Sequence, residues 1–357
     1  MVALLSTSLD DDAACHVLAT PDDRRAVPHH RICKALWPLL SLAFLISVVS
    51  GIVYAVQSNA SSHETALSNT QRIIVSPTSC IAPPPSQRVV LFWETQVDGC
   101  TTVPPGVTHI VFGFALVQQS RVVPTFQGAE ATLRACIAAL QERCIVVMAS
   151  IGGATNVDGM ANIDAPDAFA ASALALVESF GFDGVDIDDE TVGSQHDATR
   201  VTAYMTALYR ALKSGSKTYY ISYDVFVFEG VASFCTKAVH AAYSRCFAPA
   251  LLPLLDWINI MAYNVDIDRT AAAAFYANAT SSTFPEWFSS HLGGDVAKAT
   301  IGICVGSSCA YGDGPSDAVI TDWTAYAKTH GGMMVYAGSS DINFAATESI
   351  ITALAPH

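Results

Sequence analysis

From Arg88 to the end of the chain, short apolar runs alternate with segments whose apolar residues recur at helical spacing. The helical segments include 169–180 and 201–212, where apolar residues return every three or four positions. The short runs are rich in β-branched and aromatic residues, as buried strands are. There are eight: Val89–Trp93, Thr108–Leu116, Cys144–Ser150, Gly181–Glu190, Tyr219–Val227, Trp257–Asn264, Ala299–Val305 and Gly332–Ala337.

Strands that alternate with helices predict βαβ units and a parallel sheet. Eight such units in about 270 residues predict an α/β fold, a single (β/α)8 TIM barrel. In a barrel of this kind the chemistry lies at the carboxyl ends of the strands. We therefore place the domain at residues 86–357 and expect its functional side chains where the predicted strands end.

A longer apolar run precedes this domain. Residues 36–56 contain no charged residue, and about 20 residues suffice to cross a bilayer. Arg24, Arg25, Arg31 and Lys34 come before the run, and the next basic residue after it is Arg72. By the positive-inside rule the run predicts a single-pass type II transmembrane signal-anchor with the domain extracellular or lumenal. Residues 1–35, polar and irregular, then form a disordered cytoplasmic tail.

A cleaved signal peptide is the alternative to a retained anchor. Val53-Tyr54-Ala55 resembles a small-residue cleavage site, and cleavage near Ala55 would give a secreted protein. The long basic leader and the length of the apolar run favour retention. Residues 57–85 are rich in Ser and Thr and end in three prolines, which predicts an extended linker between the membrane and the barrel.

Cysteine usage agrees with an oxidising compartment for the domain. Two cysteines precede the apolar run and eight follow it, an even number that suits disulfides. The short spacings favour neighbouring pairs, namely 80–100, 136–144, 235–246 and 304–309.

Asn59 and Asn278 each begin a glycan acceptor tripeptide. The chain has no C-x-x-C or H-E-x-x-H motif, so it offers little support for a zinc site. A net charge of −14 argues against nucleic acid as a partner.

The chemistry of the chain is concentrated in Gly181–Glu190, GFDGVDIDDE. A strand has a period of two, so Asp186, Asp188 and Glu190 project to one side, with Asp183 out of phase. Crowded carboxylates raise one another's pKa, which keeps an acid protonated near neutral pH and able to donate its proton. A solvated acidic turn and a divalent-cation site are the alternatives. Alternation with β-branched residues favours a barrel strand and a catalytic role.

The four acids form a complete D-x-x-D-x-D-x-E motif, which resembles that of glycoside hydrolase family 18. Ser150-Ile151-Gly152-Gly153 is similar to the family's S-x-G-G motif, and Met261-Ala262-Tyr263-Asn264 to its M-x-Y-N motif. The family comprises chitinases, endo-β-N-acetylglucosaminidases and inactive chitinase-like lectins. The resemblance implies a (β/α)8 barrel with the acid motif on the fourth strand.

The resemblance also implies a mechanism without metal or organic cofactor. Glu190 would protonate the glycosidic oxygen, and Asp188 would orient the acetamido group of the substrate, which acts as the nucleophile. Asp186 would share a proton with Asp188, and Tyr263 would donate a hydrogen bond to the acetamido oxygen. The remaining candidates are assigned to substrate binding, although Asp183 has a structural role as its alternative: Asp183, Trp93, Ser150, Gly152, Gly153, Asn264 and Tyr336.

Two departures from the family pattern bear on the substrate. Members commonly have a Trp on the eighth strand, where this chain has Tyr336, and Asp189 beside the acid is closer to some endo-β-N-acetylglucosaminidases. We expect a monomer that hydrolyses β-1,4 linkages next to N-acetylglucosamine in chitin or chitooligosaccharides. Cleavage of N-glycan chitobiose cores, or sugar binding without catalysis, are the alternatives. The predicted partners are an N-acetylglucosamine-containing glycan and, through residues 36–56, a lipid bilayer.

Overall fold

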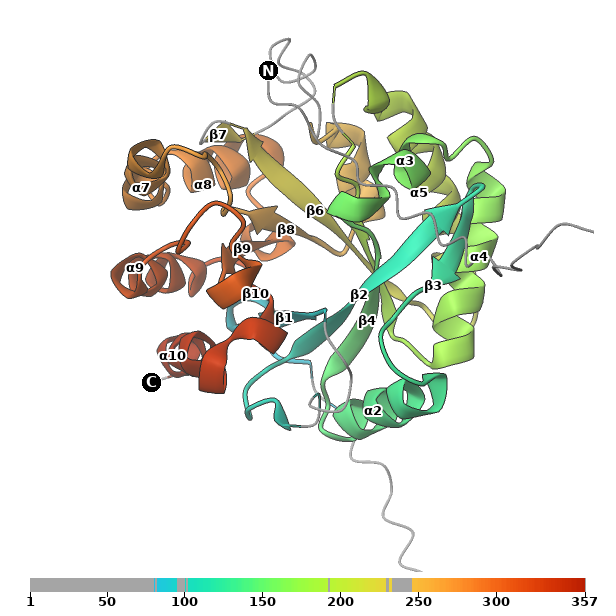
Figure 1. Ribbon diagram of the computed structural model, residues 1–357, viewed down its shortest axis with the longest axis horizontal. Coiled ribbons are helices and arrows are strands. Elements are labelled where there is room, and N and C mark those ends of the chain that lie inside the picture. The colour runs from blue at the N-terminus through green and yellow to red at the C-terminus, as the bar shows by residue number, and fades with distance from the viewer. Residues whose placement is uncertain are drawn as a thin grey trace, which may run out of the picture. The chain divides into compact units, whose positions relative to one another are not determined.

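The computed structural model describes residues 80, 82–94, 100, 102–191, 193–228, 231–232 and 246–356 (Figure 1). Within these residues eight strands pair in parallel, and the last pairs with the first, so that the sheet closes into a barrel. The predicted eight-stranded parallel barrel is therefore confirmed. Its strands are β1 (Val89–Trp93), β2 (His109–Gln118), β4 (Val146–Gly152), β5 (Gly184–Asp188), β6 (Tyr220–Phe228), β8 (Trp257–Met261), β9 (Ala299–Cys304) and β10 (Met333–Tyr336).

Two further strands were not predicted. β3 (Arg121–Pro124) pairs antiparallel with the end of β2, and β7 (Val231–Ala232) pairs antiparallel with the end of β6. The turn between β2 and β3 is made by Gln119 and Ser120, both with positive φ, at 50° and 57°. Such two-residue turns are usually marked by Asn-Gly or Asp-Gly. The sequence lacks that signal here, so the hairpin is evident only in the structure.

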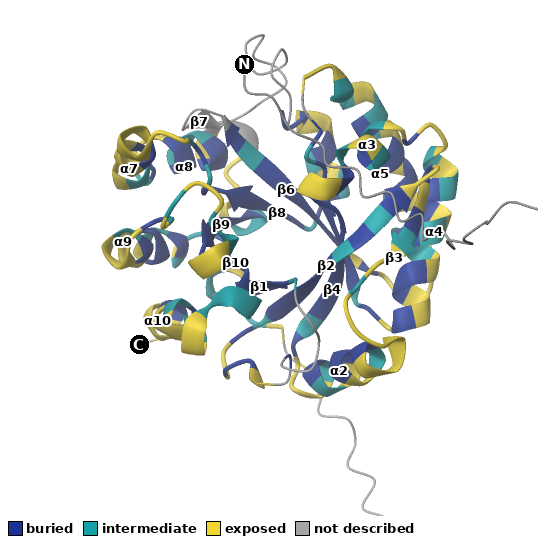
Figure 2. Ribbon diagram, viewed as in Figure 1, coloured by how far each residue is buried: buried dark blue, intermediate teal, exposed yellow. Residues whose placement is uncertain are grey.

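Helices surround the barrel and turn their buried faces toward it (Figure 2). In the described part of the chain they are α2 (Glu130–Glu142), α3 (Val157–Ala161), α4 (Pro166–Phe180), α5 (Ala198–Lys213), α7 (Arg269–Asn278), α8 (Thr283–Glu286), α9 (Asp317–Ala327) and α10 (Ala345–Leu354). The helical patterns at 169–180 and 201–212 thus belong to α4 and α5. Asp197 caps α5 by accepting hydrogen bonds from the backbone N–H groups of Thr199 and Arg200, as N-terminal caps do.

The period of two along each strand separates two apolar regions. Outward residues such as Val185 and Ile187 pack against the helices, whereas inward residues such as Phe92 fill the barrel.

At the amino-terminal end of the barrel, the Arg88 guanidinium lies over the Trp257 ring at 4.6 Å, and His109 meets the same ring edge-on. Burial, and then the charge of Arg88, lower the pKa of His109 to about 3, so this end is closed by a neutral imidazole at physiological pH.

One predicted disulfide is confirmed and two are wrong. Cys304 and Cys309 are bonded as predicted, but Cys80 pairs with Cys144 and Cys100 with Cys136. Cys136 lies within α2 and Cys144 beyond its end, and the six residues of helix from Cys136 to Glu142 alone advance about 9 Å. That exceeds the reach of a disulfide, about 7 Å between Cα atoms. Cys246 is also disulfide-bonded, and Cys235, its predicted partner, lies outside the described residues.

No helix in the described ranges has the length and apolar character needed to cross a membrane. The predicted tail 1–35, the anchor 36–56 and most of the linker 57–85 lie outside those ranges, as does the glycan acceptor Asn59. Asn278, the other acceptor, is exposed at the end of α7.

Candidate active site

The acids of the motif follow one line from the barrel floor to its mouth. Asp186 and Asp188 lie on the inward face of β5, and Glu190 follows two residues after it. Asp186 is 0% exposed and Asp188 4%, whereas Glu190 is half-buried. Two residues of strand advance about 6.6 Å, so the side chains are stepped along the barrel axis. Glu190 is therefore the acid of the line that a molecule at the mouth meets first.

Asp186 is held by side chains from three other strands of the barrel. Ser150 Oγ on β4 donates to it at 2.8 Å, Ser222 Oγ on β6 at 2.6 Å, and Asn259 Nδ2 on β8 at 3.1 Å. Burial raises the pKa of Asp186 to about 6, and these hydrogen bonds oppose the rise. The sequence suggested mutual repulsion as the cause of a raised pKa in this cluster. For Asp186 the larger cause is loss of solvent.

A second buried carboxyl, Asp224 on β6, was not identified from the sequence. It is 4% exposed, and Asn259 Nδ2 donates to its Oδ1 at 2.9 Å. Burial raises the pKa of Asp224 well above its usual range, and the nearby charges of Asp186 and Asp188 raise it further. The signal was present, since a period of two along Tyr220–Phe228 puts Ser222 and Asp224 on the inward face.

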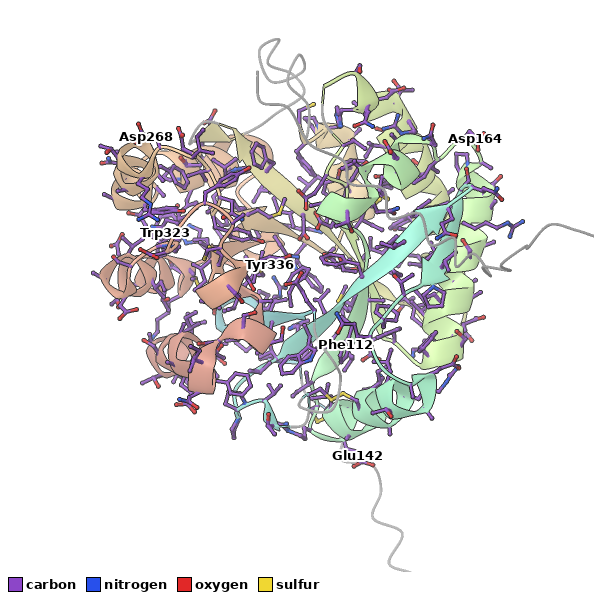
Figure 3. The ribbon with its side chains drawn as sticks, in the orientation of Figure 1. Phe112, Glu142, Asp164, Asp268, Trp323 and Tyr336 are labelled. Atoms are coloured by element: carbon purple, nitrogen blue, oxygen red, sulfur yellow. A yellow bond between two sulfur atoms is a disulfide. The ribbon has the colours of Figure 1, made fainter. Side chains whose placement is uncertain are left out.

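Two stacked phenols lie near these acids. The rings of Tyr263, after β8, and Tyr336, at the end of β10, are parallel within 6°, with centroids 5.5 Å apart. Figure 3 labels Tyr336 near the middle of the barrel. Its hydroxyl donates to Glu94 Oε1, a carboxylate at the end of β1 that was not identified from the sequence. Burial raises the pKa of both phenols, so at neutral pH each keeps its proton and can donate it in a hydrogen bond.

Two predicted substrate-binding residues lie elsewhere. Trp93 points outward from β1, is 5% exposed and stacks on Phe344 at 6.4 Å. The period of two turns its side chain toward the helices, so the prediction that it binds substrate is wrong. Asp183 precedes β5, at the end of the barrel opposite Glu190. Its Oδ2 accepts from Gln141 Nε2 and from the backbone N–H of Val147, each at 3.0 Å, which indicates a structural role.

The glycines of the S-x-G-G motif contact protein atoms. A Cβ on Gly152, whose φ is +117°, would lie 2.2 Å from the carbonyl oxygen of Asp188. Gly153 donates its N–H to that oxygen at 2.9 Å, and a Cβ on it would meet the Phe114 ring at 3.1 Å. The pair therefore lets the end of β4 approach the backbone of Asp188. We assign them a positioning role in place of the predicted substrate contact.

Ser150 and Asn264, also predicted to bind substrate, are likewise engaged with the protein. Ser150 is 0% exposed, and its hydroxyl donates to Asp186. Asn264 Oδ1 accepts from the backbone N–H of Ala310 at 2.9 Å, which joins the loop after β8 to the loop after β9. Both residues therefore act on the site by holding other parts of it.

Asp189 points away from the other acids, as the period of two predicts. Its side chain is buried on the helix side of β5, where Tyr204 on α5 donates to Oδ2 at 2.8 Å and the N–H of Thr191 to Oδ1 at 3.1 Å. Oδ2 thus attaches the end of β5 to α5, and Oδ1 holds the backbone of the loop that follows the strand.

We expect Asp189→Asn to lower stability and to leave the acid line in place. An amide has one acceptor oxygen, so one of the two donors that Asp189 satisfies becomes unpaired in a buried site, at a cost of about 1–3 kcal/mol. Chemical denaturation measures that loss. Asp167→Asn is the matched control, because this carboxylate on α4 is 90% exposed and binds only Arg210 at 3.3 Å among the contacts described. Equal stability of the two variants would contradict the prediction.

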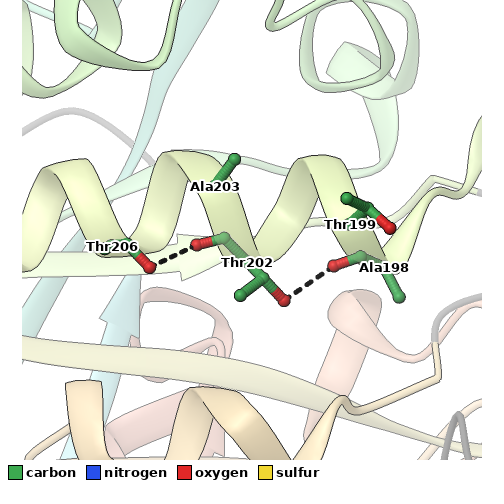
Figure 4. Close-up of a pocket in the computed structure, with 5 residues that line it drawn as sticks. All are labelled: Ala198, Thr199, Thr202, Ala203 and Thr206. Carbon is green, nitrogen blue, oxygen red and sulfur yellow. Dashed lines mark hydrogen bonds between the residues drawn. The ribbon is translucent and has the colours of Figure 1, made fainter.

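A hollow of about 560 Å³ lies against the outer face of α5, apart from the acid line. Figure 4 shows its lining, Ala198, Thr199, Thr202, Ala203 and Thr206. The hydroxyls of Thr202 and Thr206 donate to carbonyls one turn back in the same helix, each at 2.7 Å.

Among the described residues, no group of three or more His, Cys, Asp or Glu side chains is placed to hold a metal ion.

Known proteins are similar to this chain in sequence or in fold. The chain is 29% identical over 140 residues to Endochitinase 1 of Metarhizium anisopliae, a match that covers 38% of this chain and about a third, 32%, of that relative. A family 18 chitinase of Pseudoalteromonas aurantia superposes with a TM-score of 0.56 at 17% identity, over 75% of this chain and 100% of that one. The chitinase-like agglutinin of Robinia pseudoacacia gives 0.59 at 17% identity, over 74% and 99%.

The structural matches show a common fold, and the family assignment comes from the sequence. The profile of glycosyl hydrolases family 18 matches residues 88–307, more than half of the 357 residues. The matched region contains the fourth barrel strand with its line of acids, the glycines that support it and Tyr263. The chain belongs to glycosyl hydrolases family 18.

Proposed function

We propose that the protein hydrolyses β-1,4 linkages next to N-acetylglucosamine in chitin or chitooligosaccharides. The observation that carries the proposal is the line of Asp186 and Asp188 on the inward face of β5 and Glu190 just after it, half-buried at the mouth. The stacked phenols of Tyr263 and Tyr336 add aromatic surface and hydrogen-bond donors beside it. The similarity to Endochitinase 1 of Metarhizium anisopliae supports the choice of substrate.

In the proposed reaction the substrate supplies its own nucleophile, an exception to the scheme of two catalytic carboxylates. Glu190 protonates the glycosidic oxygen as its bond to the anomeric carbon breaks, and the acetamido oxygen bonds to that carbon from the opposite face. Asp188 stabilises the positive charge that develops on the acetamido group, and the Tyr263 hydroxyl donates to the acetamido oxygen. Water activated by Glu190 then opens the cyclic intermediate with retention of configuration.

Tyr336 provides the floor on which we place the reacting sugar. The hydrogen bond from Tyr336 to Glu94 and the parallel stacking of Tyr336 on Tyr263 hold the Tyr336 ring in place. The reacting sugar would therefore lie on two stacked phenol rings, where other family members commonly have a single Trp indole. Aromatic rings bind the apolar face of a sugar by burying C–H groups against the π-surface. A preorganised ring loses little conformational freedom when the sugar binds.

Two other functions remain alternatives. Asp189 beside the acid favours cleavage of the chitobiose core of N-glycans, although its side chain lies on the helix side of the strand. Sugar binding without catalysis is the second, since a chitinase-like agglutinin shares the fold. The presence of Glu190, a carboxyl side chain at the mouth, favours hydrolysis.

The test is incubation of the full chain with chitin oligosaccharides and, separately, with a high-mannose glycoprotein, followed by mass spectrometry of the products. Shortened oligosaccharides support the proposed function. Release of glycans that leaves one N-acetylglucosamine on the protein would replace it with the N-glycan function. Binding measured by calorimetry, without product from either substrate, would replace it with a lectin.

We also propose that the domain is tethered outside the cytoplasm by residues 36–56. Support comes from the sequence, namely an uncharged run of membrane-spanning length with basic residues before it. Alkaline carbonate extraction should leave the protein in the membrane pellet, because an integral helix resists extraction. A fully soluble protein that begins near Ala55 would show cleavage instead.

A further inference from the structure

Two buried carboxyls, those of Asp186 and Asp224, contact each other at the inner end of the acid line. Asp186 on β5 is 0% exposed and Asp224 on β6 4%. Asn259 Nδ2 lies 3.1 Å from Asp186 Oδ1 and 2.9 Å from Asp224 Oδ1, and the two carboxyls also hydrogen-bond to each other. A hydrogen bond between two carboxyls requires a proton on one of them. Two carboxylates this close and out of reach of water cannot both ionise freely.

The surrounding donors decide which carboxyl holds the proton. Asp186 accepts three side-chain hydrogen bonds, from Ser150, Ser222 and Asn259, and donors of this kind stabilise an ionised carboxylate. Asp224 accepts from Asn259. The proton therefore belongs on Asp224, whose hydroxyl can donate to Asp186.

The amide of Asn259 is oriented by its other neighbours. Its Oδ1 accepts from Trp257 Nε1 at 3.0 Å and from Thr300 Oγ1 at 2.7 Å. The indole N–H of Trp257 can only donate, so it requires the amide oxygen on its side, which turns the NH₂ toward the two carboxyls. With its NH₂ directed there, Asn259 cannot accept a proton from either carboxyl, and the hydrogen bond between Asp186 and Asp224 must carry it.

We propose that Asp224 is a positioning residue that holds the proton of the Asp186–Asp224 pair and donates it to Asp186, so that the barrel floor below Asp188 carries one negative charge. This differs from the sequence-based prediction, in which Asp186 shares its proton with Asp188. The assignment of the proton stands on the buried geometry. Its effect on turnover rests on the proposed function.

The electrostatics of the pair agree with this assignment. Burial, followed by the charges of Asp186 and Asp188, raises the pKa of Asp224 well above its usual range, and burial raises that of Asp186 to about 6. The other titratable groups near Asp224 are the phenols of Tyr223 and Tyr263, whose pKa values are also raised by burial, so they stay neutral. Between about pH 6.5 and 8 the folded pair therefore retains one proton.

Folding of the full chain tests where the proton lies. Both carboxyls are ionised in the unfolded chain above pH 6.5, so folding takes up one proton and the folding constant falls about tenfold per pH unit through this pair. Asp224→Asn keeps the shape and a donor but cannot take up the proton. We expect the folding constant of the wild type, divided by that of this variant, to fall about tenfold per pH unit between 6.5 and 8.

Thr300→Val is the matched control for the folding measurement. It removes a hydroxyl from the same network, where Thr300 Oγ1 donates to Asn259, but no titratable proton. We expect its pH dependence to match that of the wild type. The histidines with lowered pKa, His109 and His196, are present in all three proteins and cancel in the ratios. Parallel pH dependence of the wild type and Asp224→Asn would overturn the assignment.

The pH profile of turnover tests the positioning role. Asp224→Ala removes a donor to Asp186, so the pKa of Asp186 rises and the acidic limb of kcat moves up by roughly one pH unit. Asp224→Asn, with an amide donor, should restore part of that shift. An equal loss of kcat at every pH, with the limb unmoved, would overturn the positioning role. A wild type without turnover would overturn the proposed function. The folding measurement would still show whether Asp224 holds the proton of the pair.

Discussion

Glu190→Gln is expected to lower the turnover of chitin oligosaccharides by about 10²–10⁴-fold, the range typical of general acid–base catalysis. Gln keeps the size and polarity of Glu190 but has no proton to give to the glycosidic oxygen. Because Glu190 is half-buried at the end of the acid line, the substitution leaves Asp186 in the hydrogen bonds that Ser150 and Ser222 donate to it. Oligosaccharide affinity should therefore change little.

The measurement is kcat and equilibrium binding on one oligosaccharide for the wild type and two variants. Glu178→Gln is the matched control, because it makes the same change from a carboxylate to an amide at an exposed position on α4, outside the barrel. We expect the control to behave as the wild type in both measurements. Undiminished turnover in Glu190→Gln would rule out this residue as the acid. Loss of binding together with turnover would point to a role in holding the sugar.

The barrel and its line of acids were predictable because they depend on local periodicity. Each strand is a short run of β-branched and aromatic residues, and the period of two along β5 assigns Asp186 and Asp188 to the interior. The same rule assigns Trp93 to the helix side of β1. The prediction that Trp93 binds substrate did not take the direction of its side chain into account.

The parts that could not be predicted depend on which strands and helices become neighbours. Asp224 becomes part of the acid cluster because β6 lies beside β5, which brings it to Asp186 across 38 residues of chain. Glu94 meets Tyr336 because β10 closes the barrel onto β1. The pairing of Cys80 with Cys144 likewise depends on how the chain before β1 approaches the end of α2. None of these contacts can be inferred from the spacing of residues along the sequence.

The support of Asp188 by the backbone of Gly152 leads to the second large effect. A Cβ at this position would lie 2.2 Å from the carbonyl oxygen of Asp188, well inside van der Waals contact, and the φ of +117° is one that L side chains rarely adopt. Gly152→Ala must therefore push the end of β4 away from β5. Overpacking and backbone strain together predict a loss of about 2–5 kcal/mol in the free energy of unfolding.

Gly181→Ala separates the two causes of that loss. Gly181 also has a positive φ, +84°, as the cap of α4, but no atom lies within 4 Å of its ideal Cβ position. It should lose only the strain of a left-handed residue, about 1–2 kcal/mol, and keep full turnover. Folded Gly152→Ala should also lose turnover, since a misplacement of about 1 Å at a catalytic group can cost about 10²-fold. Denaturation and kcat measured on both variants decide the matter. Equal losses would mean that β4 yields to the Cβ easily, and that Asp188 does not depend on the glycine for its position.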